Sequence, residues 1–235
     1  MASDVNLEVT MRSWLVGVAA VSMMAACGGG GGGSSEGAVS GTIGGQAFTP
    51  TETRAVIAGP SNCTVQSTPV NVKAFALRFA SFTGVCTALA SDPLCELTHS
   101  AQTVSVVFAD VGVGGVSPTL GAGTFTLTSD PTSLTGAEAH TNPSDPLVGT
   151  LSIAFGGAVV TGASCQMATA PQAAQGTLTV KSVTASEITG SVDLTFGTGT
   201  DMLKGDFAAA LCSPITDVCP LAETGGTCSG TPTCD

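Results

Sequence analysis

The stretch from Glu187 to Leu211, EITGSVDLTFGTGTDMLKGDFAAAL, decides the fold class of this chain. Apolar and polar residues alternate along it, which is the period of a β-strand with one buried face. The apolar positions are Ile188, Val192, Leu194 and Phe196 and, beyond the turn, Leu203, Phe207, Ala209 and Leu211. The polar positions between them are Thr189, Ser191, Asp193, Thr195, Lys204 and Asp206. The residues GTGT at 197–200 join the two halves, which predicts an antiparallel hairpin of strands 187–196 and 201–211.

Segments rich in β-branched and aromatic residues also occur in the rest of the chain. Residues 70–82, VNVKAFALRFASF, are the most hydrophobic and predict a buried central strand. Before it we expect a short hairpin turning at Gly44 and Gly45, then a strand over 53–58 that ends at the GPSN sequence of 59–62. Further strands are predicted at 103–109, 124–128, 148–155 and 176–184.

Two segments lack the period of a strand. Residues 86–97, CTALASDPLCEL, allow one or two helical turns before Pro93 interrupts them. Residues 129–147 hold three prolines and no apolar period, which predicts a long loop. The acidic residues of this loop would offer oxygen ligands to calcium, but their spacing is not that of a calcium-binding loop, so a solvated loop is the preferred interpretation. These acidic residues are Asp130, Glu138 and Asp145.

Together these segments predict an all-β protein. The expected architecture is an antiparallel β-sandwich, with a barrel-like closure as its variant, over residues 38–212. It would carry one short helical insert and a disulfide-rich C-terminal tail at 213–235, where apolar periodicity is almost lacking. Only 10% of the residues are charged and glycine is abundant, which is typical of an extracytoplasmic β-protein rather than a helical one.

The cysteines divide into one residue near the N-terminus and an even set of eight. An even set in an exported chain predicts disulfides. The eight candidates are Cys63, Cys86, Cys95, Cys165, Cys212, Cys219, Cys228 and Cys234. The best single pairing prediction is a local bridge between Cys86 and Cys95. Zinc binding is the alternative, but the chain has no CxxC motif and His99 and His140 lack companions at ligand spacing, so no metal or other cofactor is predicted.

The N-terminal residues indicate export. Arg12 precedes an uncharged, largely apolar run from Ser13 to Ala26, which is shorter than the roughly 20 residues needed to cross a bilayer. A short apolar run behind a positive charge is typical of a cleaved signal peptide, here residues 1–26. Because Asp4 and Glu8 are acidic where such a signal is basic, we expect Met11 to be the true start.

The end of this segment, MAAC at 24–27, resembles the lipobox of bacterial lipoproteins. The resemblance implies that Cys27 becomes the acylated first residue of the mature chain and holds it to the membrane. Gly28 follows that cysteine where an inner-membrane lipoprotein would have Asp, which implies the outer membrane of a two-membrane cell. Six glycines at 28–33 then begin a tether, residues 27–37, with a reach of about 17 Å. Two alternatives are ordinary signal cleavage with Cys27 in a disulfide, and a membrane-buried helix.

Several features together widen this resemblance. The polyglycine tether, the SGTIGGQAF opening at 40–48, the cysteine-containing insert and the closing strands are similar to those of largely uncharacterised lipoproteins from delta-proteobacteria. The resemblance implies no catalytic residues.

Charge and aromatic content narrow the function classes. Seventeen acidic and six basic residues give a net charge of −11, which disfavours nucleic acid as a partner. The chain has no GxSxG motif and no Tyr, and its one Trp, Trp14, lies in the signal segment, so sugar stacking is also disfavoured. We therefore expect a non-enzymatic structural or interaction module held to the cell envelope by lipid. The alternatives are a tethered binding protein for a small ligand, ion or secreted partner, and then an extracytoplasmic hydrolase.

Overall fold

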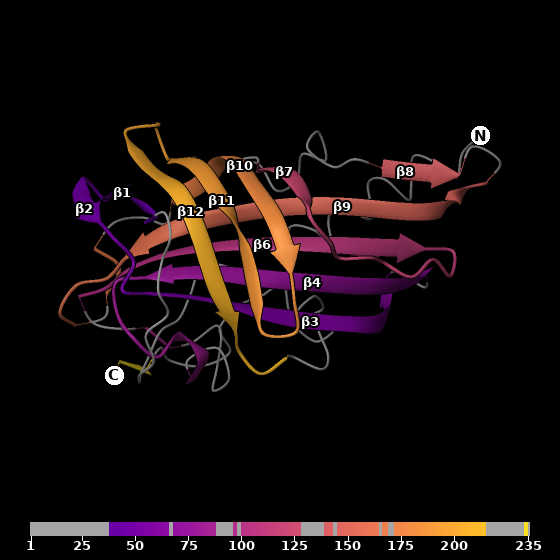
Figure 1. Cartoon of the computed structure of the whole chain (residues 1–235), viewed down its shortest axis with the longest axis horizontal. Helices are drawn as coiled ribbons and strands as arrows, with labels where there is room; N and C mark the ends of the chain where they lie inside the picture. Colours follow the sequence, from indigo (N-terminus) through magenta and orange to yellow (C-terminus); the bar gives the residue numbers. More distant parts are fainter. Residues whose placement is uncertain are drawn as a thin grey trace.

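The computed structural model describes most of the segment that the sequence predicts to fold. The described residues are 38–65, 68–87, 96–97, 100–127, 139–142, 145–164, 166–168, 172–214 and 233–234. The structure is built from strands (Figure 1). Their bounds are β1 Ser40–Ile43, β2 Gln46–Phe48, β3 Glu52–Val65, β4 Thr68–Ala80, β5 Glu96–Leu97, β6 Gln102–Val113, β7 Gly123–Leu127, β8 Ala139–Asn142, β9 Asp145–Val160, β10 Gln172–Val183, β11 Glu187–Phe196, β12 Asp201–Leu211 and β13 Thr233–Cys234.

Seven of these strands close into a barrel. Their order is β11-β10-β9-β6-β4-β3-β12, and a pairing between β11 and β12 completes the circle. All neighbours are antiparallel except β12 and β3, which run parallel. The predicted all-β, largely antiparallel fold is confirmed, and of the two closures considered the molecule adopts the barrel.

The barrel has two narrow seams. Strands β9 and β10 pair only at Gln172 with Ala158 and Ala173 with Gly157. Strands β12 and β3 pair only through residues 210–211 with 54–55. Between the seams, neighbouring strands pair along most of their length. The barrel therefore consists of two sheets, β3-β4-β6-β9 and β10-β11-β12, which cross at a steep angle in Figure 1. A sandwich and this barrel share the same alternation of residues, which is why the sequence left both open.

The inner faces of the two sheets form one apolar core. Its largest fully buried side chains include Phe48, Phe75, Phe79, Phe108, Phe196, Leu77, Leu178, Ile188, Leu194 and Leu203. Phe79 of β4 meets Phe207 of β12 edge to face, with ring centroids 5.7 Å apart, and this contact joins the two sheets across the β12–β3 seam. The strand predicted at 70–82 is therefore central and buried, as expected.

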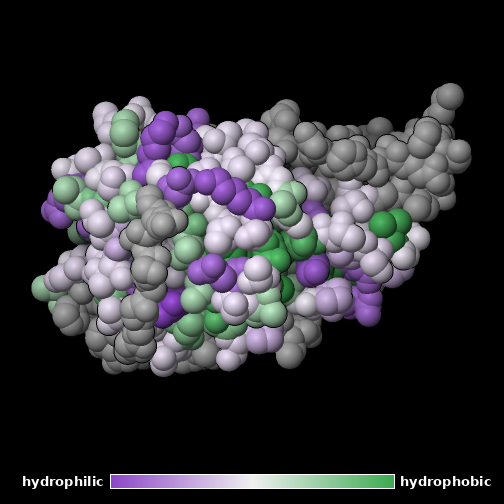
Figure 2. Space-filling model, viewed as in Figure 1, coloured by the Kyte–Doolittle hydropathy of each residue, from purple (hydrophilic) through white to green (hydrophobic). Residues whose placement is uncertain are grey.

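The hairpin predicted at 187–211 is confirmed in bounds and in facing. Strands β11 and β12 pair from Glu187 with Ala210 to Phe196 with Asp201. Their alternate polar side chains face outward, and Lys181 of β10 lies 2.6 Å from Asp206 there. In Figure 2 hydrophilic and near-neutral residues cover much of the face that carries these strands.

Gly190 in β11 shows how closely the core is packed. A Cβ atom at this position would lie 2.1 Å from the carbonyl oxygen of Thr179 and 2.8 Å from the ring of Phe207. Phe207 is paired with Gly190 across β11 and β12 and is 5% exposed. The glycine therefore leaves the space that the aromatic ring occupies.

Two strand boundaries differ from the prediction. Strand β3 does not end at the GPSN sequence but continues to Val65. A register shift between Ala58 and Ser61 accommodates Gly59 and Pro60, whose peptide bond is cis, so the chain forms a bulge and pairing with β4 resumes. The predicted loop at 129–147 is also wrong in part, because β8 and the start of β9 lie within it and pair with each other.

The predicted helical insert lies only partly within the described residues. Residues 85–87 are helical, whereas Glu96 and Leu97 form β5 and pair in parallel with β13. The rest of the predicted insert, residues 88–95, lies outside the described residues, as does most of the C-terminal tail.

Candidate functional site

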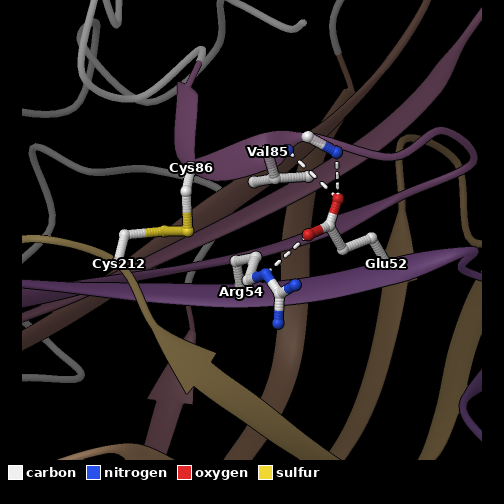
Figure 3. Close-up of a disulfide and its surroundings, with 6 residues drawn as sticks. Glu52, Arg54, Val85, Cys86 and Cys212 are labelled. Atoms are coloured by element: carbon white, nitrogen blue, oxygen red, sulfur yellow. Dashed lines mark hydrogen bonds and ion pairs between the residues drawn. A yellow bond between two sulfur atoms is a disulfide. The ribbon is translucent and has the colours of Figure 1, made fainter. Parts of the chain in front are cut away.

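A group of polar contacts lies beside a disulfide at the β12–β3 seam, and we call the contacts and the disulfide together the seam cluster (Figure 3). Its members are Glu52, Arg54, Gly84, Val85, Cys86 and Cys212. Strand β3 supplies the Glu and the Arg, the segment after β4 supplies Gly84 to Cys86, and Cys212 follows the last residue of β12. The cluster thus joins three parts of the chain that are far apart in sequence.

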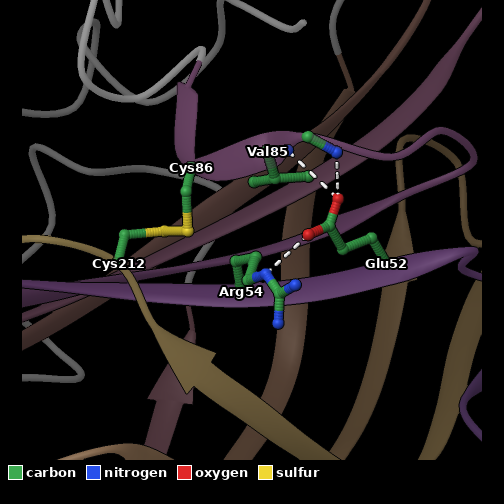
Figure 4. Close-up of polar contacts among 6 residues, drawn as sticks. Glu52, Arg54, Val85, Cys86 and Cys212 are labelled. Carbon is green, nitrogen blue, oxygen red and sulfur yellow. Dashed lines mark hydrogen bonds and ion pairs between the residues drawn. A yellow bond between two sulfur atoms is a disulfide. The ribbon is translucent and has the colours of Figure 1, made fainter. Parts of the chain in front are cut away.

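Glu52 is the centre of the polar contacts. Its side chain accepts the backbone N–H groups of Gly84 and Val85 at Oε2, the latter at 3.1 Å. The Nε of Arg54 lies 2.5 Å from the other oxygen, Oε1 (Figure 4). Glu52 is only 7% exposed, and both of its oxygens are engaged. This carboxylate therefore fastens the segment after β4 to the outer face of β3.

The disulfide joins Cys86 to Cys212, with a Cα–Cα distance of 5.2 Å and a sequence separation of 126. The predicted Cys86–Cys95 bridge is therefore wrong. The barrel closure explains the difference, because β12 runs parallel to β3 and places its end beside the segment after β4. The backbone N–H of Cys212 also donates to the carbonyl of Ala55, at 2.8 Å.

Arg78 on β4 adds a buried positive charge next to the cluster. It pairs in register with Arg54 on one side and with Ser105 on the other, and its Nε donates to the Ser105 hydroxyl at 3.3 Å. Arg78 is 5% exposed, and desolvation by burial lowers its pKa to about 10. The guanidinium is therefore still charged at neutral pH.

An apolar group lies alongside these polar contacts, outside the barrel core. It contains Val56, Ala80 and Val85, with Phe82 and Cys212 packed against it. Here the outer face of the β3–β4 sheet is buried as well as the inner one. The alternation of side chains along residues 70–82 places Arg78 on the face opposite the core residues Phe75, Leu77 and Phe79. It does not indicate that this outer face is also covered.

Two further polar groups lie away from the seam cluster. On β6, Asp110 is 4% exposed and accepts a hydrogen bond from the Ser152 hydroxyl at 2.6 Å. At the start of β12, Asp201 is equally buried and accepts the backbone N–H groups of Gly44 and Gly45 at 2.8 and 3.0 Å. The second carboxylate therefore holds the turn between β1 and β2 against the barrel.

The other residues singled out in the sequence are placed as follows. Cys63 is bonded in a disulfide, and Cys234 lies in β13. His140 lies in β8 and Asp145 begins β9. The residues outside the described part of the chain are Cys27, Cys95, His99, Asp130, Glu138, Cys165, Cys219 and Cys228.

Two searches of the described residues gave negative results. They hold no group of three or more His, Cys, Asp or Glu side chains placed to bind a metal ion. None of the helices in this part of the chain has the length and apolar content needed to cross a membrane.

The seam cluster holds three parts of the chain together and contains one bond that can react, the disulfide. Glu52 is held by three donors, and these contacts fix the backbone that carries Cys86. The disulfide itself is the group in the cluster that can be broken and re-formed covalently, by exchange with a thiolate. Among the described residues, the predicted disulfide cysteines Cys63, Cys86 and Cys212 are in disulfides.

Comparison of the chain with protein-family models, with curated proteins and with solved structures found no match. Function therefore has to be inferred from this chain's own residues and contacts.

Proposed function

We propose that this chain is a lipid-anchored protein of the cell envelope, acylated at Cys27 and placed at the outer membrane. Its barrel is a non-enzymatic structural or interaction module. Residues 27–37 tether the barrel to the lipid.

The observation that carries the proposal is the filled interior of the barrel. Phe75 and Phe79 project inward from one sheet, and Leu194 and Leu203 from the other, and all four are at most 1% exposed. In a small barrel whose lumen is filled by side chains, contacts with other molecules are made by the outside. The threonine, serine, lysine and aspartate side chains of β10–β12 supply such an outer surface (Figure 2).

The disulfides support the export part of the proposal. A disulfide joins Cys86, after β4, to Cys212, after β12, and Cys63 is also oxidised. Disulfides of this kind persist in oxidising compartments and are rare in the cytosol. This supports a compartment outside the cytoplasm.

The start of the barrel supports the tether. Val39 is 5% exposed and belongs to the core, and Ala38 lies next to Gly205 of β12. Core packing thus includes Val39, two residues after the end of the predicted tether. A glycine-rich segment of ten residues reaches about 17 Å, which holds the barrel close to the membrane without burying it there.

The test is to express the chain in a two-membrane bacterium with labelled fatty acid. Wild-type protein is expected to carry the label and to sediment with outer membranes, whereas Cys27→Ala carries no label and is soluble. Ser34→Ala, in the same tether, is the control and behaves as wild type. Label on the Cys27→Ala variant, or an unlabelled Cys27 in native wild-type protein, contradicts the proposal.

A further inference from the structure

The two seams of the barrel are closed in different ways. Strands β9 and β10 follow each other in sequence, and the connection between them folds back through a bridge between Thr161 and Met167. The N–H of Ala168 donates to the carbonyl of Val160 there, at 2.8 Å. Strands β12 and β3 are far apart in sequence, and among the described residues they meet through two residue pairs and the Cys212 N–H bond to Ala55. The Cys86–Cys212 disulfide ties the end of β12 to the segment after β4.

Strand β12 has two partners besides β11, and only the second of them is β3. The first half of β12 pairs with β1, from Met202 with Thr42 to Lys204 with Ser40, and Asp201 holds the adjoining turn. The second half meets β3 through residues 210–211 and through the Cys212 N–H bond to Ala55. The disulfide lies directly after this second contact.

We propose that the Cys86–Cys212 disulfide is a redox latch that holds the β12–β3 seam closed. The bond ties the end of β12 to a segment that Glu52 fastens to β3, so it links the two sheets at a seam with only two residue pairs. Neither Cys86 nor Cys212 is fully buried. The pairing of β12 with β1 involves neither cysteine.

A dithiol supplies the reducing equivalents. One of its thiolates attacks a sulfur of the Cys86–Cys212 bond and forms a mixed disulfide, which releases the other cysteine as a thiolate. The second thiolate of the reductant then displaces the remaining cysteine and closes the reductant's own disulfide. Two electrons pass to the protein, and two protons convert Cys86 and Cys212 to thiols.

Opening the latch separates apolar groups that face each other across the seam. The edge-to-face contact of Phe79 with Phe207 joins β4 to β12, and Ala55 and Ala209 belong to the same core. Once β12 moves away from β3, these side chains meet solvent. The reduced protein therefore presents an apolar surface that the oxidised protein keeps buried.

The first test compares hydrogen exchange in wild type and in the Cys86→Ser, Cys212→Ser double variant. The amides that face the seam are those of Ala55, Ala210 and residue 212, since Cys212 donates to Ala55 there, whereas the Leu211 amide donates to Ser186 on the other side of β12. These three amides are expected to exchange about tenfold faster or more in the variant, while those of the β10–β11 pairing change less than about twofold. Cys27→Ser, which removes a cysteine outside the barrel, should match wild type. Unchanged exchange at residues 55, 210 and 212, or an equal rise throughout the barrel, would overturn the latch.

A second test uses the wild-type protein and so does not depend on the variant folding. The chain is treated with increasing dithiothreitol under native conditions and alkylated, and the modified cysteines are identified by mass spectrometry. Cys86 and Cys212 are expected to be labelled before Cys63, with the strand signal in circular dichroism retained and binding of an apolar dye increased. Labelling that accompanies loss of the strand signal, or labelling with no rise in dye binding, would refute the proposal.

Discussion

Charged residues on the outer face of the β3–β4 sheet are buried, and each is held by specific partners. Glu52 accepts two backbone N–H groups and faces Arg54, while Arg78 donates to Ser105. Such groups are costly to bury unless hydrogen bonds compensate for lost hydration. Their effect on stability therefore depends on their partners more than on their number.

Arg78 provides a pH-dependent prediction. Its pKa in the folded protein, about 10, lies below the ordinary value of an arginine because burial removes its hydration, so the unfolded chain holds this proton to higher pH. The folded state is penalised while Arg78 is charged, and the penalty falls as pH rises through 10. The free energy of unfolding of wild type, minus that of Arg78→Met, should rise by roughly 1 kcal/mol at most between about pH 8 and 10.5. Urea unfolding of both proteins at each pH measures it; a difference that falls would be inconsistent with a desolvated guanidinium.

Gly190 provides a prediction about packing. Gly190→Ala places a methyl group against the Thr179 carbonyl and the Phe207 ring, and the barrel should lose about 1 to 3 kcal/mol or more of unfolding free energy. Gly121→Ala is the matched control, because its added Cβ meets nothing within 4 Å. Thermal and urea unfolding compare the two variants. Equal stabilities would mean that Phe207 can move aside.

At the scale of elements, the β1–β2 hairpin depends on a residue of another strand. Its three and four residue strands are too short to be stable alone, and β1 pairs with β12 while Asp201 holds the turn. The same strand, β12, therefore pairs with both β1 and β3. This dual role explains why one strand can close the barrel with few residue pairs to β3.

Asp201→Ala tests the role of this carboxylate. The substitution leaves two backbone N–H groups without their acceptor, so we expect a loss of about 1 to 3 kcal/mol in unfolding free energy and faster exchange of the Gly44 and Gly45 amides. Asp193→Ala is the control, because Asp193 forms an exposed ion pair with Lys204 and such pairs contribute little. If both variants lose the same free energy of unfolding, the buried hydrogen bonds of Asp201 stabilise the fold no more than the exposed ion pair does.

At the scale of the whole molecule, one disulfide joins the segment after β4 to the residue after β12, and so links the two sheets of the barrel. It spans 126 residues of sequence, and a bond that closes a long loop restricts the unfolded chain. The Cys86→Ser, Cys212→Ser variant should therefore lose about 2 to 4 kcal/mol of unfolding free energy. Cys27→Ser, outside the barrel, is expected to lose none. Urea unfolding with the remaining disulfides intact measures both, and a double variant as stable as wild type would argue against this contribution.

Local alternation of residues determined much of the fold. Strands β11 and β12 were predicted to the residue, and β4 and β7 to within two residues, because alternate side chains state which face of a strand is buried. Disulfides at Cys63, Cys86 and Cys212 were predicted because the cysteines left after Cys27 are even in number and the chain is expected to be exported. The lipid anchor at Cys27 and the domain bounds stay predictions.

What only the tertiary structure decided is which distant segments meet. Alternation of polar and apolar residues predicts which face of a strand is buried, but not which strand lies beside it. The sequence therefore could not predict the parallel β12–β3 seam, the Cys86–Cys212 pairing or the partners of Glu52. The continuation of β3 past Gly59 and Pro60 depends on its pairing with the adjoining β4, and Arg78 is buried between β3 and β6. The physical reason is that closing the barrel is a choice among non-local pairings of similar strands, and those contacts form between residues more than a hundred positions apart.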